Sequence, residues 1–208
     1  MNVAFREPNS EQELADLFTF RQSVYAQTDS LKSMVQKSDV TFFDQRALHF
    51  AAYHENQVVA YMRMVQKTDT KFADWVKNSS PEKDHLNSDN IEFPFENYSP
   101  NKAWNKDFLS RFENQKIGEA GKLAIAKNYR SNIFLAEFVQ SFLDYCIEKN
   151  GFHSGFGVCT LELERFYKRI GFYRPEGAEP FTHADLPLAV IVQFDAAPIS
   201  QTHSTLQP

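Results

Sequence analysis

Two short segments in the second half of the chain carry residues that can do acid–base chemistry. In the first, Glu119-Ala120-Gly121-Lys122 stands at the start of an apolar run. A carboxyl group that enters a buried strand has its pKa raised toward neutral pH, which suits it to accept a proton. In the second, Phe166-Tyr167-Lys168-Arg169-Ile170-Gly171-Phe172, the Tyr167 hydroxyl can donate a hydrogen bond or a proton. The residues alone leave the plainer alternatives open, a surface carboxylate at a strand end and a tyrosine packed in the core.

Charged side chains in the first half of the chain form a second set of candidate site residues. Arg21 interrupts the apolar face of an early helix, three residues after Phe18 and four before Tyr25. An arginine at such a position either extends to the rim of the core or binds a carbonyl, carboxylate or phosphate. Asp44 and Arg63 could complete a polar site with it, or form an ordinary buried ion pair. We expect His49 to be a hydrogen-bonded histidine of a strand.

The composition narrows the possible functions. The 208 residues include 22 Lys and Arg against 27 Asp and Glu, a net charge of −5, which argues against a general nucleic-acid binder. Only 7 residues are Gly, less than half the average usage of about 7%, which disfavours a glycine-rich phosphate loop. The two cysteines, Cys146 and Cys159, lack metal-ligand spacing, so we expect no metal. No apolar run reaches the roughly 18 residues of a membrane span and no signal pattern opens the chain, so we expect a cytoplasmic protein.

These residues must be positioned by a mixed sheet with helices packed on it. Ser10 and Glu13 form a capping box that predicts the start of the early helix. Apolar periodicity then predicts strands at Ala47–Tyr53, Gln57–Val65, Lys122–Ala126, Phe156–Thr160 and Leu188–Phe194, and helices at Asn105–Asn114, Ile133–Lys149 and Leu161–Ile170. This alternation is typical of an α/β (α+β) fold. We expect one domain over residues 1–194, with an insertion at 66–118, followed by a disordered tail at 195–208.

The two segments resemble parts of a known superfamily. Glu119-x-x-Lys122-Leu123-Ala124-Ile125, followed by Tyr129-Arg130, is similar to the fourth strand and pyrophosphate turn of the GNAT-type N-acyltransferases. Tyr167-x-x-x-Gly171-Phe172 is similar to a later helix end of the same proteins. The chain resembles most the acyl-homoserine-lactone (autoinducer) synthases, the long-chain N-acyl amino acid synthases and the exosortase-associated acyltransferases. Supporting features are Arg21-x-x-Val24-Tyr25, Asp44 followed by His49, Arg63 within a strand, and Phe93-Pro94-Phe95-Glu96.

The resemblance, which runs with gaps from Arg6 to Tyr173, implies a fold, an activity and a set of site residues. The fold would be GNAT-like, a mixed central sheet flanked by helices. The activity would be transfer of an acyl group, in the first place a fatty-acyl group, from a CoA or acyl-carrier-protein thioester to the amine of a small molecule such as an amino acid. Catalytic roles would belong to Glu119 and Tyr167. The donor would be bound by Leu123, Ala124, Ile125, Arg130 and Ser131, and the acceptor by Arg21, Tyr25, Asp44, Arg63 and Lys122.

Two departures from the family pattern keep other functions open. The turn Arg130-Ser131-Asn132-Ile133-Phe134-Leu135 has neither glycine of the usual R-x-x-G-x-G/A, so side chains crowd the approach of a pyrophosphate. Lys122 replaces a planar arginine by a point charge. These departures favour a carrier protein or a loosely held CoA as donor. The alternatives are an acetyltransferase that uses acetyl-CoA, and a catalytically silent domain that binds acyl thioesters.

The length of the pocket should separate these functions, because a long acyl chain needs an apolar tunnel and an acetyl group does not. The segments that would wall such a tunnel contain Phe42, Phe43, Phe93, Phe95, Phe108 and Phe112.

Overall fold

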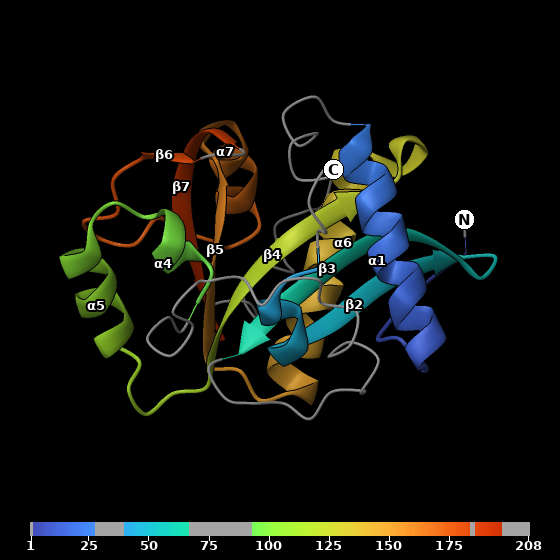
Figure 1. The fold of residues 1–208 in the computed structure, drawn as a ribbon, viewed down its shortest axis with the longest axis horizontal. Helices are drawn as coiled ribbons and strands as arrows, with labels where there is room; N and C mark the ends of the chain where they lie inside the picture. Colours follow the sequence, from blue (N-terminus) through green and yellow to red (C-terminus); the bar gives the residue numbers. More distant parts are fainter. Residues whose placement is uncertain (1, 28–39, 67–92, 184–185, 197–208) are drawn as a thin grey trace.

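The computed structural model describes residues 2–27, 40–66, 93–183 and 186–196. Seven strands form one sheet in the order β1-β2-β3-β4-β5-β7-β6 (Figure 1). The strands are β1 (Val3–Arg6), β2 (Ala47–His54), β3 (Gln57–Gln66), β4 (Ile117–Ile125), β5 (Ser154–Thr160), β6 (Phe181–His183) and β7 (Leu186–Asp195). The α-helices are α1 (Glu11–Ala26), α4 (Phe95–Tyr98), α5 (Lys102–Ser110), α6 (Asn132–Asp144) and α7 (Leu161–Arg169), with short 3₁₀ turns η2 (Phe42–Arg46) and η4 (Lys127–Tyr129). Every pairing is antiparallel except that of β4 with β5.

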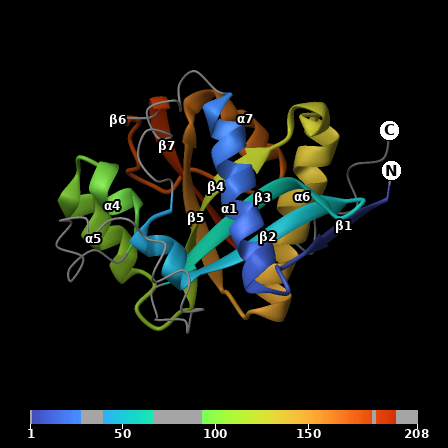
Figure 2. The same cartoon turned by 45° about the vertical axis from the view of Figure 1, so that its right-hand side comes forward.

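Helix α1 begins where the capping residues predict. The Ser10 side chain accepts a hydrogen bond from the Glu13 N–H at 3.1 Å, which satisfies one of the free donors of the first turn. The Glu13 carboxylate bonds the N–H of Asn9 and the Arg6 guanidinium instead of closing the predicted box on Ser10. Figures 1 and 2 show α1 lying across one face of the sheet, which we call the front, with α6 behind the other face, the back.

The predicted hairpin of β2 and β3 is correct to within one residue at each outer end. Glu55 and Asn56 link the strands with positive φ angles of 51° and 64°, which turns the chain with the twist that paired strands prefer. Alternation along β3 sends Tyr61, Arg63 and Val65 to the front, and Met62 and Met64 to the back.

Strand β4 begins at Ile117, five residues before the predicted strand. The missed part contains Gly118, Glu119 and Gly121, residue types that are depleted in strands, so the local pattern concealed it. Glu119 therefore lies within the strand rather than at its start. Strand β4 pairs with β3 over most of its length, with a bulge at Lys122 where φ is +57°.

The remaining differences concern element ends and short strands. The predicted helix Ile133–Lys149 ends as an α-helix at Asp144 and continues as one π-helical turn, Tyr145–Lys149. Helix α5 begins three residues before the predicted Asn105. The four-residue β1 and three-residue β6 were not predicted. Residues 197–208, most of the predicted tail, and 67–92, within the predicted insertion, lie outside the described residues.

Both faces of the sheet carry apolar cores. On the back, α6 and α7 pack Phe138, Phe142 and Tyr167 against the strands. On the front, one cluster lies under α1, and a second lies under α4 and α5 around Phe156 of β5. Within the described residues no helix is long and apolar enough to cross a membrane. The two front clusters leave a polar zone between them, where the candidate site lies.

Candidate active site

The site begins where β4 and β5 separate. Their parallel pairing runs from Ile117 with Ser154 to Ala120 with Gly157 and goes no further, and the two strands diverge beyond this point (Figure 1). A Cβ on Gly157 would lie 2.7 Å from the Ala120 carbonyl oxygen, so only glycine permits this close approach. From Gly121 to Ile125, β4 has no pairing with β5 along this edge.

A pocket of about 340 Å³ opens at the outer end of that edge. It is lined by Val24, Tyr25, Leu123, Ile125, Arg130, Ser131, Asn132 and Leu135, which come from α1, β4 and the start of α6. Four of the five predicted donor-binding residues are among them. The fifth, Ala124, is buried in the cluster under α1.

The turn that leads into α6 is closed by its own side chains. The Arg130 Nε donates to the Ile125 carbonyl at 2.9 Å, and the Ser131 hydroxyl accepts from the Phe134 N–H at 3.2 Å. The hydroxyl thus occupies part of the helix N-terminus, where a phosphate would find its amide donors. An anion at this turn must displace or share that cap.

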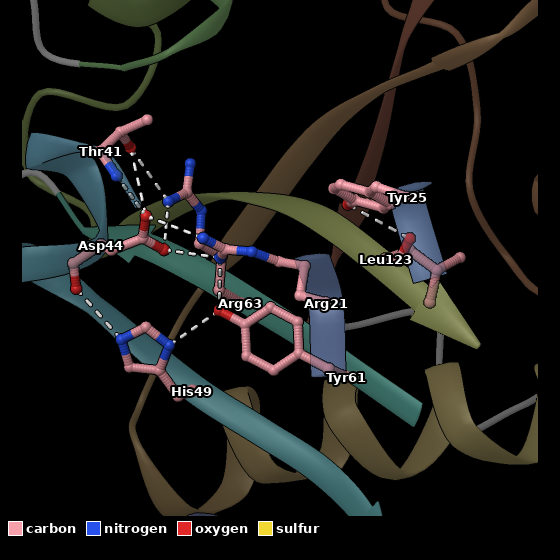
Figure 3. Close-up of polar contacts among 8 residues, drawn as sticks. All are labelled: Arg21, Tyr25, Thr41, Asp44, His49, Tyr61, Arg63 and Leu123. Carbon is pink, nitrogen blue, oxygen red and sulfur yellow. Dashed lines mark hydrogen bonds and ion pairs between the residues drawn. The ribbon is translucent and has the colours of Figure 1, made fainter. Parts of the chain in front are cut away.

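Lys122 and Tyr25 lie together beside the pocket. The Lys122 ammonium lies 5.7 Å from the centre of the Tyr25 ring, and the Tyr25 hydroxyl donates to the Leu123 carbonyl at 3.4 Å (Figure 3). A lysine with positive φ is strained, and such strain gathers at functional sites. Of the five predicted acceptor-binding residues, Lys122 therefore lies in the bulged part of β4 and Tyr25 contacts it.

Glu119 is buried on the front of the sheet, two residues before the strands separate. Its side chain accepts a hydrogen bond from the Phe95 N–H of α4 at 2.9 Å, and its neighbour in β5 is Phe156. Burial raises the pKa of Glu119 to about 8, against the lowering effects of the Phe95 N–H and the Arg63 charge. The carboxyl group is therefore mostly protonated at pH 7, and its ionised form, which grows as the pH approaches 8, is the form that can accept a proton.

A buried ionic cluster lies next to Glu119 on the same face. The Asp44 carboxylate receives Nη1 of Arg21 at 2.9 Å and Nη2 at 3.3 Å, and also pairs with the Arg63 guanidinium (Figure 3). Burial opposes the ionisation of Asp44, but the two guanidinium groups outweigh it and hold its pKa well below the usual value. Arg21 and Asp44 are fully buried, and Arg63 is 3% exposed. Among the described residues, the buried Nε of Arg63 has no hydrogen-bond partner.

Three further residues of the cluster were not predicted for the site. The Tyr61 hydroxyl accepts from Arg21 Nη1 at 3.0 Å and lies 2.9 Å from His49 Nδ1, and His49 Nε2 lies 3.1 Å from the Asp44 carbonyl oxygen. A carbonyl oxygen can only accept, so Nε2 carries the proton of a neutral imidazole and Nδ1 accepts from Tyr61. Burial lowers the pKa of His49 to about 4, which agrees with the predicted satisfied histidine. Thr41 donates its N–H to Asp44 at 2.8 Å.

The sequence contains a pattern that could have identified Tyr61 as a site residue. It stands two residues before Arg63 in a predicted strand, so the two side chains share a face. The role of Thr41 had no such signal.

Tyr167 lies on the back of the sheet, opposite Glu119. Its ring contacts Phe166 and Phe172, with centroids 5.6 and 5.1 Å apart, within the core under α6 and α7. Burial raises the pKa of its hydroxyl. The structure does not bring Tyr167 together with Glu119.

No protein-family model and no curated protein matches the sequence. Three solved structures resemble the fold over nearly their whole length. FeeM, an N-acyl amino acid synthase from uncultured soil microbes, has a TM-score of 0.61 at 12% identity over 97% of this chain and 93% of its own. An acyl-CoA N-acyltransferase from Pseudomonas aeruginosa has a TM-score of 0.56 at 13% identity, over 93% of this chain and 98% of its own. The AHL synthase LasI has a TM-score of 0.56 at 14% identity, over 93% of this chain and 89% of its own. The strand order, the gap between β4 and β5 and these likenesses show that this chain has the GNAT N-acyltransferase fold that its Glu119–Ile125 and Phe166–Phe172 segments predict.

Proposed function

We propose that this protein is an N-acyltransferase that moves an acyl group from a CoA or carrier-protein thioester to the amine of a small molecule that carries a carboxylate, such as an amino acid. The observation that carries the proposal is Glu119, a buried carboxyl group with a pKa of about 8, placed beside the unpaired edge of β4. A purely structural carboxylate gains little from such a site, because burial without a cationic partner in direct contact destabilises the charged form.

The residues divide the chemistry between them. Glu119 accepts a proton from the amine as the nitrogen bonds to the thioester carbon. The carbon–sulfur bond then breaks, an amide forms, and the thiolate takes up a proton and leaves as a thiol. Backbone N–H groups around Ala124 and Ile125 stabilise the oxyanion, and Tyr167 hydrogen-bonds the departing sulfur through the gap.

The ionic cluster supports an acceptor with a carboxylate. Among the described residues, the buried Nε of Arg63 has no hydrogen-bond partner, and the Arg63 guanidinium pairs with Asp44. An acceptor carboxylate that reached Arg63 would pair with a buried guanidinium in a dry environment, where ion pairs are strongest. Arg21 is fully buried and holds Asp44, so we assign it to positioning Asp44 and Arg63 rather than to direct contact with the acceptor.

We assign the pocket between α1, β4 and α6 to the acyl donor. The apolar lining from Leu123, Ile125 and Leu135 fits the arm of a thioester donor, and Arg130 is the cation at its mouth. The Ser131 cap weakens the grip of the α6 N-terminus on a pyrophosphate, which favours a donor whose phosphate is not held there, as on a carrier protein.

A second candidate, acetyl transfer, is favoured by the aromatic cluster beside Glu119. Phe156 is 1% exposed and packs edge-on against Phe93, Phe95 and Phe108, with ring centroids 5.1 to 5.3 Å apart. Phe43 and Phe112 join the same cluster. These described rings fill the front layer that a long acyl chain would have to enter, whereas an acetyl group needs no such room.

The experiment offers acetyl, octanoyl and palmitoyl thioesters, on CoA and on a carrier protein, with a mixture of amino acids, and detects acylated products by mass spectrometry. We expect transfer by the natural protein and its loss in Glu119→Gln, while Glu137→Gln, the same change at an exposed position of α6, stays active. Donor length then separates fatty-acyl from acetyl transfer. Binding of a thioester without any product would instead identify the silent binding domain and end the proposal.

A further inference from the structure

Gly121, which precedes the bulge at Lys122, is the one glycine of the seven at which neither a close contact nor a positive φ requires glycine. Among the other six, a Cβ would come within 3 Å of neighbouring atoms at Gly118, Gly155 and Gly157, and φ is positive at Gly151, Gly171 and Gly177. At Gly121 φ is not positive, and no atom of the described residues lies within 4 Å of the Cβ position. Glycine inside a strand costs about 0.5–1 kcal/mol relative to alanine. The empty space above this residue therefore calls for another explanation.

The surroundings of that space supply one. Gly121 pairs with Arg63 in β3, so both face the front, and Glu119, two residues earlier in β4, shares this face. On its other side, pairing with β5 has ended one residue before, at Ala120. The strained Lys122 follows, and Leu123 and Ile125 then lead along the same strand to the pocket. The space thus has a proton acceptor, a guanidinium group and the open gap on three sides.

We propose that Gly121 forms the floor of the transfer site, and that its missing side chain leaves room for the thioester carbonyl and the attacking amine beside Glu119. This inference rests on the proposed N-acyltransferase function. It adds a specificity-determining residue. Gly121 would act through the space that its missing side chain leaves, and not through a polar contact. A methyl group at this position would keep the reacting atoms apart without disturbing the sheet.

The first test compares Gly121→Ala and Gly121→Val with Gly157→Ala. We expect Gly121→Ala to lower kcat/KM by about 10²-fold, since small displacements of reacting atoms have effects of this size, and Gly121→Val to lower it further. The melting temperature of Gly121→Ala should stay equal or rise slightly, because alanine restricts the unfolded chain. Gly157→Ala, whose Cβ meets the Ala120 carbonyl, should lose stability and activity together. Unchanged turnover in Gly121→Ala, or a fall in stability that accounts for its lost turnover, would overturn the proposal.

The second test does not depend on turnover. In Gly121→Cys the new thiol should react readily with iodoacetamide, followed by intact mass, while the natural protein reacts slowly because Cys146 and Cys159 are buried. An S-octyl pantetheine thioether, which cannot transfer an acyl group, should protect the new thiol. The proposal that Gly121 forms the floor of the transfer site is refuted if the new thiol does not react. It is also refuted if the thioether leaves the labelling rate unchanged. Protection in a protein that shows no transfer would keep the donor site and refute only the proposed reaction.

Discussion

The raised pKa of Glu119 predicts that its removal makes the folded protein more stable at alkaline pH while it abolishes turnover. In the unfolded chain the Glu119 carboxyl group ionises near 4.5, and in the folded protein near 8. Between these values the folded state holds a proton that the unfolded state has released, so stability falls as pH rises. The stabilising contribution of protonated Glu119 to the free energy of unfolding is fully present below pH 4.5 and is lost once the pH passes about 8. Glutamine keeps the shape and does not titrate.

The size of the effect follows from that interval. It spans about 3.5 pH units, and at about 1.36 kcal/mol per unit it corresponds to about 5 kcal/mol, an upper bound because buried carboxyl groups relax around their charge. His49 acts in the opposite direction below pH 6.5, because its pKa is lowered to about 4. The two slopes largely cancel between pH 4.5 and 6.5 in the natural protein. From pH 6.5 to 8 Glu119 acts without that compensation and should lower stability by about 2 kcal/mol.

The assay is urea unfolding at half-unit steps from pH 5 to 8.5, on the natural protein, Glu119→Gln and the exposed control Glu137→Gln. The difference between the natural protein and Glu119→Gln isolates Glu119, because His49 and every other group titrate in both. That difference should move in favour of Glu119→Gln by more than about 1 kcal/mol for each pH unit in the middle of the range. Glu137→Gln should run parallel to the natural protein. Parallel curves for Glu119→Gln as well would mean that Glu119 has the same pKa in the folded and unfolded states, and the argument from a raised pKa would fail.

Three further perturbations test the cluster and the turn. Arg21→Ala should cost about 3–5 kcal/mol in urea unfolding, because it breaks a fully buried pair, whereas Arg6→Ala, which breaks a part-exposed pair with Glu13, should cost at most about 1 kcal/mol; equal losses would contradict the burial argument. His49→Asn should reduce stability at pH 7, and its deficit relative to the natural protein should shrink by up to about 3 kcal/mol as pH falls from 6.5 through 4, because only the natural protein loses the contribution of His49 there; a constant deficit would contradict the lowered pKa. Ser131→Ala should lower stability by about 1 kcal/mol through loss of the α6 cap, measured by thermal unfolding, and an unchanged melting temperature would show that the hydroxyl does not cap.

The sequence predicted the parts of the fold that local pattern encodes. The β2–β3 hairpin has alternating apolar residues and a two-residue turn, and α1 has a polar cap followed by an apolar stripe, so both were located closely. Strand β1, by contrast, is four residues long and is held by its register with Ala51–His54, nearly fifty positions away. The early part of β4 was missed because packing, and not propensity, places Gly118 and Glu119 in a strand.

In the candidate site, too, the sequence identified some features and could not identify others. Resemblance supplied Arg21, Asp44 and Arg63, and the structure brings them into one cluster. It could not supply their burial, which makes a loss of stability the expected effect of Arg21→Ala. Glu119 and Tyr167 were both given catalytic roles, and the structure places them on opposite faces of the sheet, which chain order does not reveal.

The separation of β4 from β5 also bears on how the sheet avoids pairing with another chain. Beyond Gly121 the edge of β4 presents backbone groups that β5 does not pair, and such an edge can recruit a strand from another molecule. Here the edge lies inside a gap walled by β5 on one side and by α1 and α6 at its outer end. Because β4 lies between β3 and β5 in the sheet, this unpaired edge faces β5 and not the outside of the sheet. That placement shields the edge from a strand of a second molecule, which is one way in which proteins avoid edge-to-edge association.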